Sequence, residues 1–102
     1  MAISKENRLL LGYLERRTMD LTGATFTEHA VVQMNRRDVD PKRVRAVLAN
    51  PEEVQNVRPG RVVVHGMDGK RLLRVFVDVD REPPAVVTVY RTSKVDKYRG
   101  RP

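Results

Sequence analysis

The chain of 102 residues is long enough for one small domain with a single core. It carries 20 Lys and Arg residues against 13 Asp and Glu residues, a formal net charge of +7, and it has no cysteine. The lack of cysteine excludes a disulfide framework, a thiolate nucleophile and a cysteine-based zinc site. No stretch approaches the roughly 18 apolar residues of a membrane span, and no apolar run near the start is typical of a signal peptide. We therefore expect a soluble, cytoplasmic, strongly basic domain that binds an anion and no membrane.

The positive charge is concentrated in two segments. Residues 36–45 contain five basic and two acidic residues, and residues 91–102 contain five basic residues and one acidic residue. Their net charges of +3 and +4 add up to the +7 of the whole chain. Clustered cations bind nucleic acid because each phosphate contact releases a condensed counterion. The pattern favours a nucleic-acid partner, and an ordinary solvated basic surface is the alternative.

Two amphipathic segments near the start of the chain predict helices. Ser4 can cap a first helix that runs to about Arg17 and has its apolar side chains on one stripe, and residues 22–25 are typical of a linker. Thr27 is a suitable N-cap for a second helix that begins at Glu28 and ends near Arg37.

A third helix is expected to follow directly. Asp40 can cap it, and Pro41 suits its first position because the fixed φ of proline is already helical there. Asn50 and Pro51 end this helical pattern.

After Pro51 the apolar residues alternate with polar ones. Residues 61–66, 70–79 and 85–91 are rich in Val, which predicts three strands. Asp68 and Gly69 are a typical two-residue hairpin turn.

That turn predicts a register in which Val64 faces Leu73 on an apolar face. The opposite face then collects Arg61, His65 and Arg74, because side chains alternate across a strand.

Helices followed by strands predict an α+β fold, in which two or three N-terminal helices pack on one face of a C-terminal antiparallel sheet. The other face is expected to stay open and basic. The predicted parts are an N-terminal helix and linker over residues 1–25, an α+β domain over residues 26–98 and a basic tail over residues 99–102. Residues 94–101 lack a clear apolar period, so we expect them to be loosely ordered.

Both histidines are candidate general bases. His29 falls in the first turn of the second predicted helix, where the helix dipole favours a neutral ring that can accept a proton. His65 shares the predicted open face with Arg61 and Arg74, whose guanidinium groups suit the oxygens of a phosphodiester. The alternative for His29 is a histidine at a helix start that has no functional role. The alternative for Arg61, His65 and Arg74 is that they are ordinary solvent-facing strand residues.

The last predicted strand ends in hydroxyls and cations. Tyr90 can stack on a base or donate a proton, and Arg91 can stabilise a phosphate. The other residues expected to contact nucleic acid are Arg36, Arg37, Thr92, Ser93, Lys94 and Lys97. The alternative is that this segment has no binding role and is simply a strand end that leads into a basic tail. The chain has two histidines and no cysteine, and its carboxylates show no ligand spacing, so we expect no metal site and no cofactor.

Several segments together resemble a bacterial domain-of-unknown-function family. They are residues 26–30, Met34, residues 37–39, residues 47–54 and residues 87–91. That family is similar to the RelE and BrnT toxins within the barnase, EndoU, colicin and RelE ribonuclease fold. The resemblance covers residues 26–98 and implies a RelE-like fold.

The motif positions of this family fall on His29, Arg37, Tyr90 and Arg91. The family often has Gly where Asp38 stands, and Asp tolerates the left-handed geometry that such a turn needs.

One main hypothesis and two alternatives follow. The main hypothesis is a metal-independent ribonuclease, the toxin of a toxin–antitoxin pair, with RNA as substrate and an antitoxin protein as partner. An RNA 2′-hydroxyl attacks the adjacent phosphate in this hypothesis, and the catalytic candidates are His29, His65, Arg74, Tyr90 and Arg91. The alternatives are a non-catalytic nucleic-acid-binding module and a protein-interaction module of the same fold.

Overall fold

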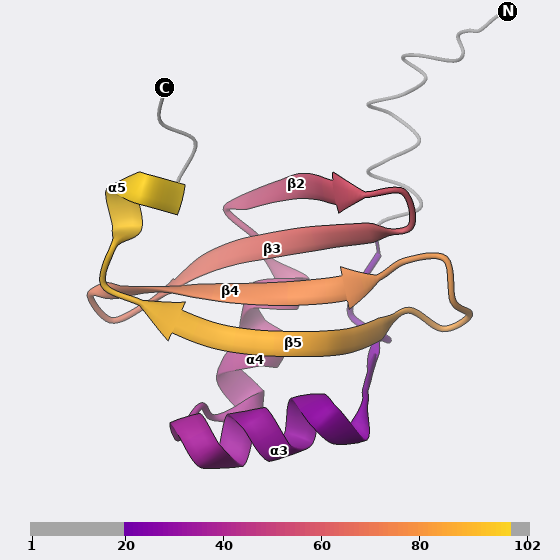
Figure 1. Cartoon of the computed structure of the whole chain (residues 1–102), viewed down its shortest axis with the longest axis horizontal. Helices are drawn as coiled ribbons and strands as arrows, with labels where there is room; N and C mark the ends of the chain where they lie inside the picture. The colour runs from indigo at the N-terminus through magenta and orange to yellow at the C-terminus, as the bar shows by residue number, and fades with distance from the viewer. Residues whose placement is uncertain (1–19, 99–102) are drawn as a thin grey trace, which may run out of the picture.

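The computed structural model of the protein describes residues 20–98. The elements in chain order are β1 (Thr25–Phe26), α3 (Glu28–Arg37), α4 (Pro41–Ala49), β2 (Glu53–Arg58), β3 (Arg61–Asp68), β4 (Arg71–Asp78), β5 (Ala85–Thr92) and α5 (Val95–Tyr98). Helices α3 and α4 precede four of the five strands, so the predicted α+β class is confirmed (Figure 1). The helix predicted over residues 4–17 and the tail predicted over residues 99–102 lie outside the described residues.

Helices α3 and α4 begin where their capping residues predict. The Thr27 hydroxyl and the Asp40 carboxylate each accept a backbone hydrogen bond from the first turn, over 3.1 and 2.9 Å, and Pro41 opens α4. α3 ends at Arg37, and its C-cap Asp38 has a φ of 57° and a ψ of 45°, in the left-handed region that Asp tolerates. Within residues 20–98, no helix is both long enough and apolar enough to cross a membrane.

The five strands form one sheet in the order β1-β5-β4-β3-β2. Strands β2 to β5 pair antiparallel, as predicted. The short strand β1, which was not predicted, runs parallel to β5, so the sheet as a whole is mixed. Residues 22–25 are more than a linker, because Ala24 is buried and Thr25 begins β1. The apolar pattern also misses β2, whose Val54 and Val57 are 38% and 46% exposed.

The hairpin between β3 and β4 has a different turn from the predicted one. Asp68 pairs with Arg71, so the turn residues are Gly69 and Lys70. Gly69 has a φ of +66°, which glycine adopts without steric cost at the first position of such a turn. The pairing is therefore displaced by two residues from the predicted register. Because side chains alternate with a period of two, each one remains on its predicted face.

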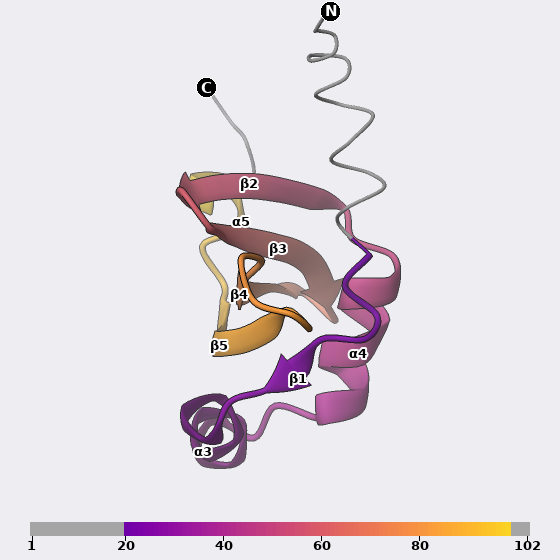
Figure 2. The same cartoon turned by 90° about the vertical axis from the view of Figure 1, so that its right-hand side faces the viewer.

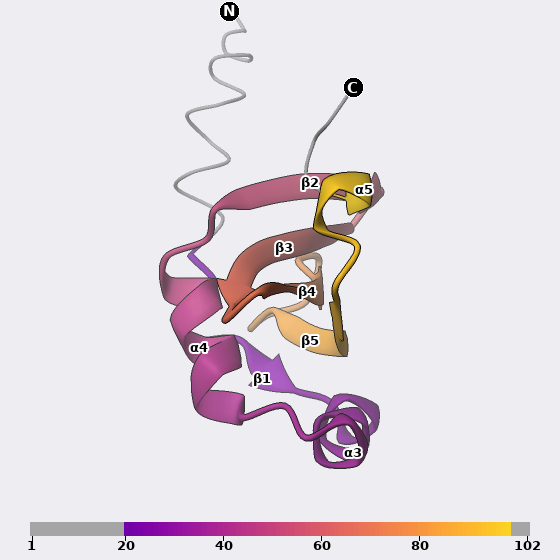
Figure 3. The same ribbon diagram turned by 90° about the vertical axis from the view of Figure 1, so that its left-hand side faces the viewer.

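The core lies between one face of the sheet and the two helices. Its buried residues include Ala30, Met34, Val44, Val47, Leu48, Val62, Val64, Leu73, Val75, Val77, Val86 and Val89. α4 covers this face, whereas α5 lies on the opposite side of the sheet (Figures 2 and 3). Gly66 permits the close packing of α4 on β3, because an added Cβ would lie 2.7 Å from a methyl group of Val47.

Helix α3 runs along the outer edge of β5 rather than under the middle of the sheet (Figure 1). β1 pairs only with Ala85 and Val86, which leaves the later part of that edge to α3. The Gln33 side chain accepts a hydrogen bond from the Val89 N–H over 3.0 Å, and the Arg37 guanidinium donates one to the Val89 carbonyl over 2.8 Å. These two side chains satisfy backbone groups that a further strand would otherwise satisfy.

Candidate nucleic-acid interface

Arg74 lies on the face of the sheet that α4 leaves uncovered. Its Nε donates a hydrogen bond to His65 Nε2 over 3.1 Å, and a terminal nitrogen donates one to the Tyr90 hydroxyl. Its guanidinium carbon also lies 4.0 Å from the ring centre of Tyr98, which is a cation–π contact. α5 therefore covers Arg74. The prediction of a loosely ordered segment from residue 94 is wrong for residues 95–98, and the predicted open face is partly closed.

His65 is fully buried, at 0% exposure. Because Arg74 Nε–H can only donate, the unprotonated Nε2 of His65 must accept, and the ring is neutral with its proton on Nδ1. Nδ1 faces Glu53 Oε1 over 3.3 Å and donates toward it. His65 thus links the Glu53 carboxylate to the Arg74 guanidinium, and both ring nitrogens are engaged within the protein.

Tyr90 connects Arg74 to Tyr98. The pKa of the Tyr98 phenol is lowered. The main cause is a hydrogen bond with the Tyr90 hydroxyl, and the positive charge of Lys97 lowers the pKa further. The Tyr90 ring is stacked with Phe76, with ring centres 6.2 Å apart and planes at 15°. We call Glu53, His65, Arg74, Tyr90 and Tyr98 the Arg74 cluster.

A pocket of about 520 Å³ adjoins Tyr90, and its lining residues are Arg37, Arg71, Tyr90 and Arg91. We call it the arginine pocket. Arg91 donates a hydrogen bond to the Arg37 carbonyl over 2.7 Å and lies 3.5 Å from an oxygen of Asp68. Arg37 is itself held by the Val89 carbonyl, so two of the three guanidinium groups have fixed positions.

The arginine pocket lies around the β5 edge of the sheet, beyond the end of α3. Arg91 pairs with Leu73 and therefore belongs to the face that the helices cover, whereas Tyr90 pairs with Arg74 on the other face. Tyr90 is thus the residue shared by the pocket and the Arg74 cluster. Residues from α3, β4 and β5 meet here, although they are far apart in the sequence.

Arg61 and His29 do not join this site. Arg61 pairs with Asp78 at the other end of β3 and binds its carboxylate with two hydrogen bonds, of 2.6 and 3.2 Å. This contact is the main cause that lowers the pKa of Asp78. His29 is exposed and lies eight residues before Arg37 on α3, which places it about 12 Å along the helix from the pocket.

The remaining predicted contact residues surround the site. Thr92 accepts a hydrogen bond from the Lys94 N–H over 3.0 Å and so shapes the turn into α5. Lys97 lies 5.2 Å from the Tyr98 ring centre, and Arg36 and Ser93 are exposed at the surface.

Glu53, Arg71 and Tyr98 belong to the site but not to the predicted set. Glu53 lies on a strand that the apolar pattern does not show. Arg71 reaches the site because β4 pairs with β5, which places Leu73 opposite Arg91 and brings the start of β4 next to the end of β5. For Tyr98, the sequence offers one signal of a role in the site, which is an aromatic residue that follows a basic strand end.

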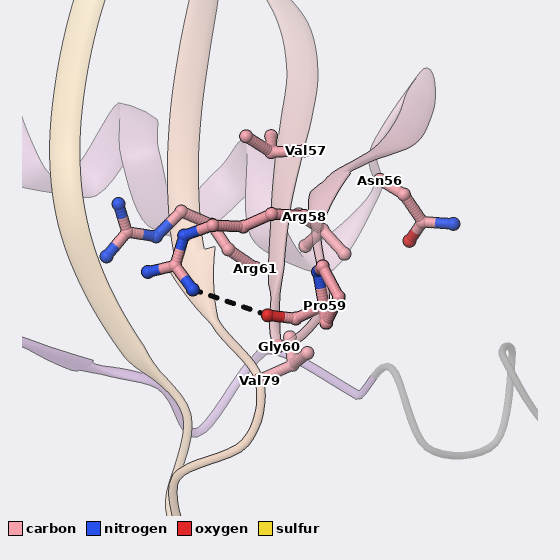
Figure 4. A pocket seen from close by; sticks show the side chains of 8 residues that line it. Asn56, Val57, Arg58, Pro59, Gly60, Arg61 and Val79 are labelled. Atoms are coloured by element: carbon pink, nitrogen blue, oxygen red, sulfur yellow. Dashed lines mark hydrogen bonds between the residues drawn. The ribbon is translucent and has the colours of Figure 1, made fainter.

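A second pocket, of about 380 Å³, opens beside the turn between β2 and β3 (Figure 4). Arg58 and Arg61 extend to the same side, while Asn56 points away from them. Arg58 donates a hydrogen bond to the Pro59 carbonyl over 3.3 Å. This pocket contains Arg61 but none of the Arg74 cluster, so the two sites are separate. Among the described residues, no three His, Asp or Glu side chains are grouped as metal ligands.

The fold and the site define a class of small basic α+β domains with an arginine-lined pocket at a sheet edge. The chain belongs to the family described as Domain of unknown function (DUF4258), which matches residues 26–91. This confirms the predicted domain-of-unknown-function family. The matched segment contains Arg37, Arg74 and Tyr90 and ends at Arg91, before Tyr98. No curated protein and no solved structure matches the chain.

Proposed function

We propose that this domain is a small ribonuclease that binds RNA at the Arg74 cluster and the arginine pocket and cleaves it without a metal ion. The observation that supports this most is the position of Tyr90, which joins a partly buried arginine to a pocket with three further arginines. Guanidinium groups bind phosphate oxygens in pairs and stabilise charge that develops on phosphorus. The expectation that this domain family is similar to the RelE and BrnT toxins also favours a ribonuclease that acts as a toxin.

The reaction that suits this site is an internal transfer at phosphorus. The RNA 2′-oxygen forms a bond to the adjacent phosphorus while the bond from phosphorus to the 5′-oxygen breaks, which yields a 2′,3′-cyclic phosphate and a 5′-hydroxyl. Because the nucleophile comes from the substrate, the protein needs only to move a proton and stabilise charge. Arg74 stabilises the negative phosphorane. Tyr98 in its phenolate form takes the proton from the 2′-oxygen, and the Tyr90 hydroxyl gives its proton to the 5′-oxygen. The hydrogen bond between the two tyrosines then returns a proton from Tyr98 to Tyr90, which restores the starting state.

This assignment differs from the histidine base of the sequence hypothesis. Both nitrogens of His65 face protein groups, and His29 lies at the far end of α3. We therefore assign His65 as a positioning residue for Arg74. Tyr98 is the proton acceptor in this assignment, because its lowered pKa makes the phenolate form easier to reach than in an ordinary tyrosine.

A second candidate function is RNA binding without cleavage. The observation that favours it is the same placement of the histidines, because neither His65 nor His29 is then placed to act as the general base. The electrostatic contacts needed for binding remain in place.

Labelled RNA incubated with the full chain in the presence of a chelator tests the proposal. We expect products that end in a 2′,3′-cyclic phosphate or a 3′-phosphate, and no cleavage of DNA or of 2′-O-methyl RNA. Tyr98→Phe and Arg74→Lys should each lower the rate by about 100-fold, the scale of one lost charge-stabilising or proton-transfer group. Arg81→Gln is the matched control, since Arg81 contacts Asp78 away from the site. Binding without cleavage would favour the second candidate, and cleavage of DNA or a strict need for divalent metal would contradict the mechanism.

A further inference from the structure

The arginine pocket has more positive charge than one internal phosphodiester needs. Three guanidinium groups line it, and the Asp68 carboxylate lies 3.5 Å from Arg91. Asp68 is also shared with Arg43, 3.6 Å away, so it neutralises the pocket only in part. A phosphodiester carries a single negative charge and two free oxygens. A terminal phosphomonoester carries close to two charges at neutral pH, because its second pKa is about 6, and it has three free oxygens.

The guanidinium groups are also arranged in advance for such a ligand. Arg37 uses a terminal nitrogen to bind the Val89 carbonyl, and Arg91 binds the Arg37 carbonyl and Asp68. These contacts fix the two side chains before a ligand arrives, which lowers the entropy lost on binding. A guanidinium has five N–H donors, so both side chains keep donors for phosphate oxygens. Arg71 is exposed at the mouth of the same pocket and completes the set.

Tyr90 connects the arginine pocket to the Arg74 cluster. Its hydroxyl binds Arg74, and its ring lies 5.9 Å from the guanidinium carbon of Arg37. A phosphate bound by Arg37, Arg71 and Arg91 would therefore lie next to the Arg74 cluster, with the aromatic ring between them available to a sugar or a base. A pocket of about 520 Å³ is also large enough for a nucleotide rather than a bare ion.

We propose that the arginine pocket is a subsite for a terminal phosphate of RNA, a 5′- or 3′-phosphomonoester, distinct from the internal phosphodiester at the Arg74 cluster. This inference rests on the proposed function, because it assigns the RNA end to one part of the RNA-binding face. A 5′-phosphate and a 3′-phosphate present the same chemical group, a phosphomonoester dianion. The domain then recognises the end of an RNA strand and places the adjoining nucleotides over Arg74.

The test compares short 2′-O-methyl RNAs of one sequence that carry a 5′-phosphate, a 3′-phosphate or hydroxyls at both ends. The 2′-O-methyl groups prevent cleavage, so fluorescence polarisation with the full chain measures binding alone. We expect one of the two phosphorylated RNAs to bind at least about tenfold more tightly than the unphosphorylated RNA, because charge-assisted hydrogen bonds are among the strong ones. Whichever end gives the gain identifies the source of the phosphate.

Variants and a small probe separate this inference from the proposed function. Arg71→Gln should remove most of the gain from the terminal phosphate, so that the phosphorylated and unphosphorylated RNAs bind this variant within about threefold of each other, and the control Arg81→Gln should keep the gain. Equal binding of all three RNAs would overturn the subsite and leave the proposed function in place. Binding of a nucleoside monophosphate that Arg71→Gln abolishes, with no binding of unphosphorylated RNA, would support the subsite and overturn the proposed function. Failure to bind any of these probes would overturn both.

Discussion

The side chain of Arg74 donates a hydrogen bond to the ring of His65 across two neighbouring strands, over 3.1 Å. A protonated imidazole could not accept this bond, so the pair is compatible with burial only while His65 is neutral. The arrangement keeps the guanidinium directed at the Tyr90 hydroxyl and places Arg74, rather than the histidine, toward a ligand. The stability and the chemistry of the site therefore depend on one buried side chain.

We expect His65→Ala to lower the free energy of unfolding by about 1–3 kcal/mol, because it removes the hydrogen-bond partner of Arg74 at a buried position. Urea denaturation measures this loss. His29→Ala is the matched control, and it should change stability by less than about 0.5 kcal/mol because His29 is exposed. Equal stability of the two variants would show that the Glu53–His65–Arg74 link contributes little.

Gly66→Ala is expected to lower stability by about 1–3 kcal/mol, because the new methyl group meets Val47 of α4 at less than contact distance. Adding Val47→Ala should recover part of the loss, so that the double variant costs less than the two single ones together. Gly23→Ala is the control, since nothing lies within 4 Å of its added Cβ. A fully additive double variant would mean that α4 does not depend on this close approach.

The Asp78 carboxylate predicts a dependence of stability on pH. Its pKa is lowered in the folded protein, mainly by the hydrogen bonds from Arg61, so the native state binds this proton less readily than the unfolded state. The contribution is fully present above the unfolded pKa of about 3.9 and is lost as the pH falls through the lower folded value. Asp78→Asn should therefore show a smaller loss of unfolding free energy between about pH 5 and pH 2 than the wild type. Parallel curves would contradict the assignment.

Binding of RNA should weaken steeply with salt, because the basic side chains act by displacing counterions from phosphates. Lys94 is exposed next to α5, and Lys94→Ala should lower the slope of log affinity against log salt concentration by about 1. Titrations at several salt concentrations measure this slope. An unchanged slope would place Lys94 outside the binding surface.

If the domain is a toxin, an acidic protein should neutralise it by covering the same arginines. Arg71→Glu reverses one exposed charge of the arginine pocket and should weaken binding of both RNA and this partner. Competition between labelled RNA and the partner, with wild type and variant side by side, measures both effects. A partner that binds the variant as tightly as the wild type must cover another surface.

The sequence by itself determined helices α3 and α4 and the faces of strands β3 and β4. Thr27 and the pair of Asp40 and Pro41 start their helices through hydrogen bonds and φ angles within one turn, so residues close in the chain are sufficient. The alternation of side chains likewise assigned His65 and Arg74 to one face, and an error of two residues in the register left that assignment unchanged. The basic strand end at Tyr90 and Arg91 was also visible, because the family pattern contains those residues.

The tertiary structure alone decided which of these groups meet. β1 is two residues long and β2 has little apolar pattern, so both depend on the neighbouring strand for their hydrogen bonds. The sequence does not show that Arg61 binds Asp78, or that α5 places Tyr98 over Arg74. Contacts of this kind join segments far apart in the chain, and their free energy arises only after the sheet has brought those segments together.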